Sequence, residues 1–294
     1  MTRIIVSLCL LIFLQACEKT ITFKLEDTSA KLVVEATIEN GRPPLVILSH
    51  SLNYFSEINP VILANSFVRD AEIIISDGTR SQKLKEYSMP LLPGVSFYYY
   101  TIDSSNLAGS FKGALASSYN MQIRTGSAVY EATTTIPALT KTLDSLWWKR
   151  SPGNPDSTLV TLMGRLYDPP GHGNYIRYFT KRGEEPFYPG LNSVYDDQII
   201  DGISYDAEVE RGVDRNAKID IDNYSFFRRG DTVTVKLCNI DKACFDFWRT
   251  MEYSYSSIGN PFAAPTKVLG NIGGSALGYF GGYAVQYRTL IIPK

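Results

Sequence analysis

The fold of this chain is decided by the stretch Lys31-Leu32-Val33-Val34-Glu35-Ala36-Thr37-Ile38-Glu39-Asn40-Gly41. Apolar side chains occupy every second position from Leu32 to Ile38, and the positions between them carry mostly polar side chains. This period of two is typical of a half-buried β-strand. Asn40-Gly41 then supplies the positive φ that a tight turn requires. The stretch therefore predicts the first strand and turn of a β domain.

Short strands with turn residues between them follow as far as Pro137. Asp77-Gly78 and Gly126-Ser127 supply turn chemistry for two hairpins. Short strands at this spacing predict an immunoglobulin-like or related β-sandwich over residues 31–137. Its further strands are expected at residues 45–49, 71–76, 80–84, 97–102, 119–125 and 128–136.

The remaining residues, 138–294, predict a second, mostly antiparallel β domain that carries one helix. The helix is expected near residues 241–255, with Asp241 as its cap and an apolar stripe that packs into a core. Residues 183–217 are acidic, aromatic and irregular, and we expect long loops there. The fold class is thus mainly β. Strands are expected at residues 143–149, 158–167, 175–181, 231–240 and 284–292.

The first residues predict an exported protein. Arg3 precedes an apolar run from Ile4 to Leu14, which is the plan of a secretory signal peptide over residues 1–16. That run is too short to span a bilayer, and no later stretch is predicted to do so. Leu14-Gln15-Ala16-Cys17 resembles the lipobox of bacterial lipoproteins. The resemblance implies acylation of Cys17, and residues 17–30 are then a lipidated tether that holds the protein on a membrane.

The charge balance and the cysteines narrow the classes of function. Removing Arg3 from the 29 basic residues leaves 28 against 30 acidic ones, a formal charge of −2. This near balance argues against a nucleic-acid partner. Cys238 and Cys244 are the remaining thiols, in a compartment that permits disulfides. They could form a disulfide or be two small half-buried residues, and without nearby histidines they predict no zinc site.

A search for catalytic or cofactor motifs predicts none. Gly273-Gly274-Ser275-Ala276-Leu277-Gly278 misses the spacing of a hydrolase nucleophile elbow by one residue. Only His50 and His172 are available as histidine bases. The acidic stretches Asp196-Asp197 and Asp220-Ile221-Asp222 lack the order of a calcium-binding loop. We therefore expect no catalytic site, no metal site and no cofactor.

Several segments resemble a known family over nearly the whole mature chain. They are the lipobox, residues 31–36, Asp168-Pro169-Pro170-Gly171-His172-Gly173-Asn174-Tyr175, residues 230–233, residues 240–248, and the closing glycine-rich motifs from Gly259 to Gly281. The family is the Bacteroidetes lipoproteins that share the domain of unknown function numbered 4249. The resemblance implies an outer-membrane lipoprotein, often encoded beside a TonB-dependent receptor, with no established catalytic activity. No functional residue carries over from it.

These observations predict an outer-membrane-anchored lipoprotein that is a non-catalytic binding or accessory subunit of a TonB-dependent transporter system. The alternatives are a structural component of an outer-membrane assembly or secretion complex, and an envelope hydrolase. The expected partner is a TonB-dependent receptor or another outer-membrane protein; the periplasmic or surface face stays open. Candidate contact surfaces are Tyr98-Tyr99-Tyr100, Phe187-Tyr188 and a segment with Asn260, Pro261, Phe262, Pro265, Asn271, Gly273 and Gly274.

Overall fold

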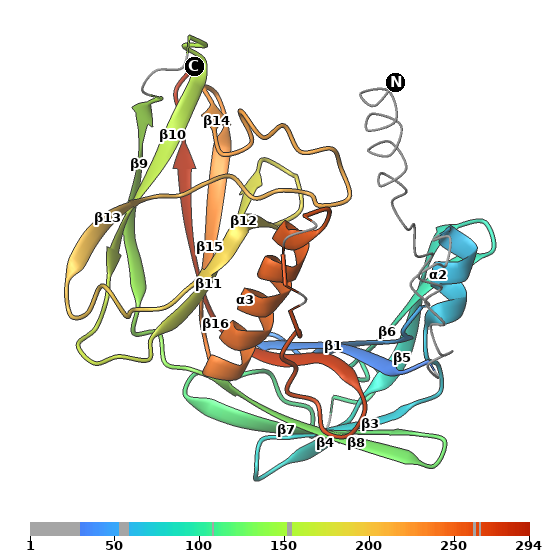
Figure 1. Cartoon of the computed structure of the whole chain (residues 1–294). Coiled ribbons are helices and arrows are strands. Elements are labelled where there is room, and N and C mark those ends of the chain that lie inside the picture. The colour runs from blue at the N-terminus through green and yellow to red at the C-terminus, as the bar shows by residue number, and fades with distance from the viewer. Residues whose placement is uncertain (1–29, 53–58, 108, 152–154, 261–262, 265) are drawn as a thin grey trace, which may run out of the picture. The chain divides into compact units, whose positions relative to one another are not determined.

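The computed structural model describes residues 30–294, except 53–58, 108, 152–154, 261–262 and 265 (Figure 1). The predicted signal peptide and Cys17 lie outside the described residues, as does the tether up to residue 29. Residues Lys31–Lys294 form one compact unit. No helix in the described ranges is long and apolar enough to cross a membrane.

An eight-stranded sheet runs through this unit. Its order is β12 (Tyr188–Tyr195), β11 (Tyr175–Arg182), β15 (Thr232–Ile240), β16 (Leu277–Ile291), β1 (Leu32–Glu39), β2 (Leu45–His50), β6 (Val95–Thr101) and β5 (Lys85–Leu92). β16 lies parallel to β1 through its first half and antiparallel to β15 through its second half. The last strand of the chain therefore joins its N-terminal part to its C-terminal part.

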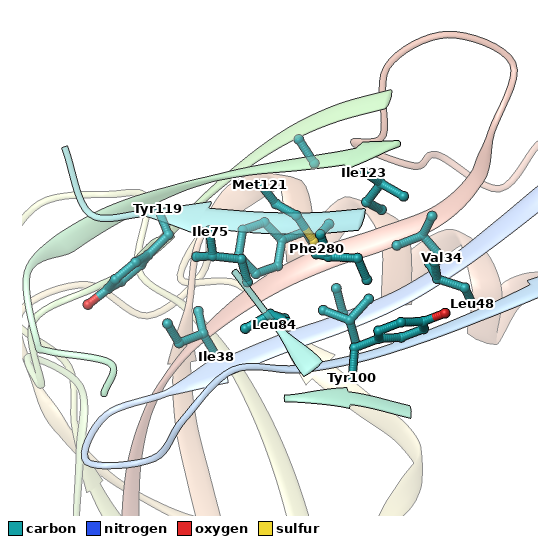
Figure 2. Packing of buried hydrophobic residues seen from close by; sticks show 14 of the residues in the cluster. Val34, Ile38, Leu48, Ile75, Leu84, Tyr100, Tyr119, Met121, Ile123 and Phe280 are labelled. Carbon is teal, nitrogen blue, oxygen red and sulfur yellow. The ribbon is translucent and has the colours of Figure 1, made fainter. Parts of the chain in front are cut away.

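A second sheet covers one face of β1 and its neighbours and completes a β-sandwich. Its order is β4 (Ser81–Lys83), β3 (Glu72–Ser76), β7 (Ser117–Thr125) and β8 (Ala128–Ile136). The apolar positions of β1 point into the space between the sheets, as their alternation predicts, and so does Phe280 of β16 (Figure 2). The mainly β class and the sandwich are confirmed. Figure 2 labels the central members of this core as Val34, Ile38, Leu48, Ile75, Leu84, Tyr100, Tyr119, Met121, Ile123 and Phe280.

The C-terminal part packs two further groups of residues on the long sheet. One core lies between β11 and β15 and a third sheet made of β9 (Thr142–Arg150), β10 (Leu159–Tyr167), β13 (Ser204–Glu208) and β14 (Phe227–Arg228). The other lies under α3 (Lys242–Ser257), the predicted helix. Asp241 caps this helix, because its carboxylate accepts the Cys244 N–H at 2.8 Å. In the apolar stripe of this helix Cys244 and Phe247 are buried, whereas Tyr255 is exposed.

Several elements differ from the prediction. The loops expected over residues 183–217 contain β12 and β13, so that prediction is wrong there; Pro189-Gly190 inside β12 hides the strand pattern. α2 (Pro60–Ser66) and β5 were not predicted, because α2 has only seven residues and β5 lacks alternating burial. The expected domain boundary after residue 137 falls between β8 and β9. The division into two domains stays a prediction. Side chains of β16 belong both to the sandwich core and to the core under α3.

Candidate functional site

A cavity of about 320 Å³ lies on the face of the long sheet that turns away from the sandwich core. Thr37 and Glu39 reach it because they alternate along β1 with the buried Ala36 and Ile38. α3 covers the neighbouring part of the same face, where Tyr283 is paired with Glu39 in register (Figure 1). The cavity is lined by Thr37, Glu39, Arg42, Pro43, Leu45, Tyr99, Thr101, Phe187, Lys236 and Tyr287.

Two of the contact surfaces expected from the sequence meet in this cavity. Tyr99 enters it from β6, and Phe187 enters it from the residue before β12. Tyr100 points the other way, into the sandwich, where its hydroxyl accepts the Ala71 N–H at 3.2 Å. Tyr98 lies under the guanidinium of Arg69, 4.5 Å from the ring centroid. Of the three consecutive tyrosines, Tyr99 alone lines the cavity.

The aromatic rings at the cavity are held by other rings. Tyr99 stacks on Tyr87 of β5 with centroids 5.7 Å apart and on Phe97 with centroids 6.1 Å apart. Phe187 packs on Tyr287 of β16 at 5.8 Å. Such pairs add stability beyond the area they bury, and they fix the direction of each ring. The cavity therefore offers preformed apolar surfaces on both of its sides.

One carboxylate and two cations line the cavity. The Glu39 carboxylate pairs with Lys236 Nζ across the intervening strand β16, and its second oxygen lies 3.7 Å from Arg42 Nε. Thr101 Oγ1 donates to the Pro44 carbonyl at 2.7 Å. Because its carboxylate is paired, the cavity presents mainly aromatic faces and hydroxyl groups, which suits binding of an uncharged molecule.

A larger recess of about 770 Å³ lies where the edges of the two sandwich sheets, β4 and β5, diverge. Glu86 is its most constrained group: it accepts the Asp70 N–H at 2.7 Å and lies 2.9 Å from the Tyr100 hydroxyl. Burial opposes ionisation of Glu86, but these hydrogen bonds outweigh it and lower its pKa. They also stabilise Asp70, which has a left-handed φ of 58°. The recess thus has a structural network along its inner wall.

The third expected contact segment lies partly outside the described residues, since these omit Pro261, Phe262 and Pro265. Of its described members, Asn271 bonds internally: Nδ2 donates to the Phe280 carbonyl at 2.8 Å, and Oδ1 accepts the Phe280 N–H at 2.8 Å. The Gly273 N–H donates to the Glu131 carbonyl at 2.8 Å, and Gly274 has a positive φ of 74°. This part of the segment therefore runs alongside β8, where Ile272 forms an isolated bridge with Ala132. A role in contacting a partner stays a prediction for these residues and for Asn260.

Cys238 and Cys244 are both free thiols and both buried. Burial raises the pKa of each thiol to about 12. The Cys244 thiol donates to the Tyr283 hydroxyl at 3.4 Å. Within the described parts of the chain, no three His, Cys, Asp or Glu side chains gather closely enough to hold a metal ion.

A buried polar network beside the helix was missed by sequence reasoning. The guanidinium of Arg177 lies 3.3 Å from the Trp248 ring centroid, and its Nε donates to Ser193 Oγ at 3.1 Å. Ser193 in turn bonds Glu252 of α3 through its N–H and its hydroxyl. No local pattern indicates such a network, because its members come from β11, β12 and α3. It ties the helix to the sheet next to the cavity.

Comparison with known proteins assigns the chain to a family. The family model described as "Domain of unknown function (DUF4249)" matches residues 18–289. The match covers the whole compact unit except its last five residues, as well as most of the predicted tether. No curated protein matches the chain.

Proposed function

The chain belongs to the family of domains of unknown function DUF4249, and we propose that it is a lipid-anchored, non-catalytic binding subunit of an outer-membrane transporter system. The anchor is the acylated Cys17, and the binding site is the cavity between Tyr99 and Phe187. The cavity carries the proposal, because it brings together two half-buried aromatic side chains, Tyr99 and Phe187, that are far apart in sequence. The transporter is a TonB-dependent receptor, a partner that rests on the resemblance in sequence.

The chemistry of the cavity indicates the class of ligand. Binding sites combine apolar and aromatic walls with a few fixed polar groups. Here Tyr99, Phe187 and Tyr287 supply flat faces, and Thr37 supplies a hydroxyl. The Glu39–Lys236 ion pair is neutral, and the remaining cation, Arg42, has a side chain that is 67% exposed, so solvent screens its charge. The ligand is therefore an uncharged molecule with flat apolar faces and hydroxyl groups, and sugar rings have this character.

The partner is tested by purifying the tagged protein from native outer membranes in a gentle detergent. Mass spectrometry should show a stoichiometric TonB-dependent barrel in the eluate and an acylated N-terminal peptide that begins at Cys17. A protein that elutes alone contradicts the transporter role. A chain with an unmodified Cys17 contradicts the anchor.

The site is tested with the same protein and a set of neutral oligosaccharides, using thermal unfolding as the readout. A ligand that binds the folded state alone raises the unfolding temperature. Tyr99→Ala and Phe187→Ala should abolish that increase, whereas Tyr253→Ala, an exposed tyrosine on α3, should leave it unchanged. If the cavity variants respond as the unaltered protein does, the ligand binds elsewhere.

A further inference from the structure

Large aliphatic side chains are exposed at one end of the sandwich. Met89, Leu91 and Leu92 of β5 and Val61 and Leu63 of α2 are each about half exposed, between 47% and 58%. These five residues are here called the apolar end. Within the described residues, β5 pairs with β6 alone, so it is the edge of the long sheet. Exposed apolar edge strands promote association unless something covers them.

The two elements of the apolar end lie side by side. Phe67, which follows α2, packs edge-on against Phe97 of β6 with ring centroids 5.2 Å apart. Phe97 is paired in register with Met89 of β5. α2 therefore lies next to the hairpin formed by β5 and β6, as Figure 1 shows. The exposed side chains of both elements belong to one region of the surface.

The tether joins the compact unit at the same end. The Lys31 N–H donates to Ser51 Oγ at 3.0 Å, and the Ser51 N–H donates to the Lys31 carbonyl at 2.8 Å. Just before Ser51, residue Ser49 of β2 forms an isolated bridge with Phe67. The point where residue 30 enters β1 is therefore close to α2. Residues 18–30 span at most roughly 45 Å even when fully extended.

We propose that the apolar end lies on the surface of the lipid bilayer to which the protein is anchored. This inference rests on the acylation of Cys17 in the proposed function. The tether limits the distance between the apolar end and the bilayer to roughly 45 Å at most. Its five side chains are all aliphatic or thioether groups, whereas binding hot spots for proteins are rich in Trp, Tyr and Arg. Phe97 and Tyr98 of β6 lie beside them, since Phe97 is paired with Met89 and Tyr98 with Ser88. Tyrosine is enriched at membrane interfaces.

The test uses a fluorescent label at single introduced cysteines. Leu63→Cys and Leu91→Cys place an environment-sensitive nitrobenzoxadiazole label in the apolar end. Val129→Cys on β8 is a matched control, because Val129 is equally exposed but belongs to the far sheet of the sandwich. The native Cys238 and Cys244 are buried and do not compete for the reagent. The acylated proteins are reconstituted in phosphatidylethanolamine and phosphatidylglycerol vesicles, with and without nitroxide-labelled lipid.

Side chains that lie on a bilayer enter it by roughly 5–10 Å. On vesicles, the labels at positions 63 and 91 should therefore emit at a shorter wavelength than in the same protein released from the vesicles by protease, in detergent-free solution. Nitroxide lipids should quench both labels. The label at position 129 should show neither effect. Equal behaviour at all three positions, in protein that still floats with the vesicles, would overturn the inference and leave the anchor intact.

Three other results separate this inference from the proposed function. Protein that fails to float with vesicles lacks the anchor, and the inference then loses its premise. Labels at 63 and 91 that are shielded only in native outer membranes, and not in pure lipid, assign the apolar end to a protein partner. Shielding that appears in solution and rises with protein concentration assigns it to a second copy of the chain. Each of these results contradicts the proposal that the apolar end lies on the lipid surface.

Discussion

Lys141 and Asp168 form an ion pair with 2.6 Å between Nζ and Oδ1, and neither side chain is more than 1% exposed. The backbone of Lys141 is fixed as well, because Asn239 bonds both its N–H and its carbonyl at 2.9 Å. Lys141 precedes β9, and Asp168 follows β10, so the pair joins the two ends of that hairpin. It lies at the first residue of the motif Asp168-Pro169-Pro170-Gly171.

Loss of one partner of this pair should be costly. Asp168→Ala leaves a buried ammonium without its counter-charge, and we expect the free energy of unfolding to fall by about 3–5 kcal/mol. The double variant Lys141→Met, Asp168→Leu should recover most of that loss. Urea denaturation measures both changes.

The control for that prediction is the exposed pair Lys149–Glu208, with 2.8 Å between Nζ and Oε1. Glu208→Ala should change the free energy of unfolding by less than about 1 kcal/mol. If Asp168→Ala is as mild as Glu208→Ala, the buried pair contributes nothing specific.

The turn that follows the ion pair should make stability depend on pH. Asp197 is buried and accepts the N–H groups of Gly173 at 3.0 Å and Asn174 at 2.9 Å. Burial opposes its ionisation, but these hydrogen bonds outweigh burial and lower its pKa. A carboxyl with a lowered folded-state pKa stabilises the protein above its unfolded-state pKa of about 3.9. That stabilisation is lost as the pH falls toward the folded-state value.

Urea denaturation from pH 7 down to pH 3 tests this dependence. Asp197→Asn should be less stable than the unaltered protein at pH 7, and its stability should fall less steeply below about pH 5. Asp196→Asn should reproduce the unaltered profile, because this half-buried neighbour accepts only a long hydrogen bond, from the Gln198 N–H at 3.5 Å. Parallel profiles for the Asp197 variant and the unaltered protein would show that the carboxylate is not linked to folding.

Asn271 should be a structural residue of the C-terminal segment. Its side chain bonds both the N–H and the carbonyl of Phe280 and also donates to the Thr133 carbonyl at 3.2 Å. Asn271→Ala leaves these backbone groups without a partner, so we expect a loss of about 1–3 kcal/mol in the free energy of unfolding. Asn106→Ala at an exposed loop position should stay within about 0.5 kcal/mol of the unaltered protein. Chemical denaturation of both variants distinguishes this role from a surface role.

Cys238 and Cys244 should be inert in the folded protein. Burial raises the pKa of each thiol to about 12 and also keeps reagents away. Maleimide treatment at pH 8 should therefore add no mass to the native protein and two adducts to the urea-unfolded protein. Rapid native labelling would contradict the burial of these thiols. An unfolded protein that takes up label only after reduction would show a disulfide.

Local patterns predict those elements whose structure depends on near neighbours in the chain. The alternation over Leu32–Ile38 and the Gly126-Ser127 turn require only that one face of a strand is apolar and that a turn follows. α3 is predicted for the same kind of reason, since Asp241 caps it and its stripe has helical spacing. β12 and β5 escape prediction because pairing with a neighbouring strand, and not an alternating pattern of their own, makes them strands.

The sequence by itself thus determined the mainly β class, most strands of the sandwich and the capped helix. It also indicated Tyr99 and Phe187 as residues that could contact a partner. Only the tertiary structure decided that these two rings line one cavity, that Glu39 pairs with Lys236 and that Lys141 is buried with Asp168. The physical reason is that a period of two fixes which way a side chain points but not which distant strand lies beside it. The strand that lies beside β1 is β16, and this parallel pairing depends on the packing of the whole unit.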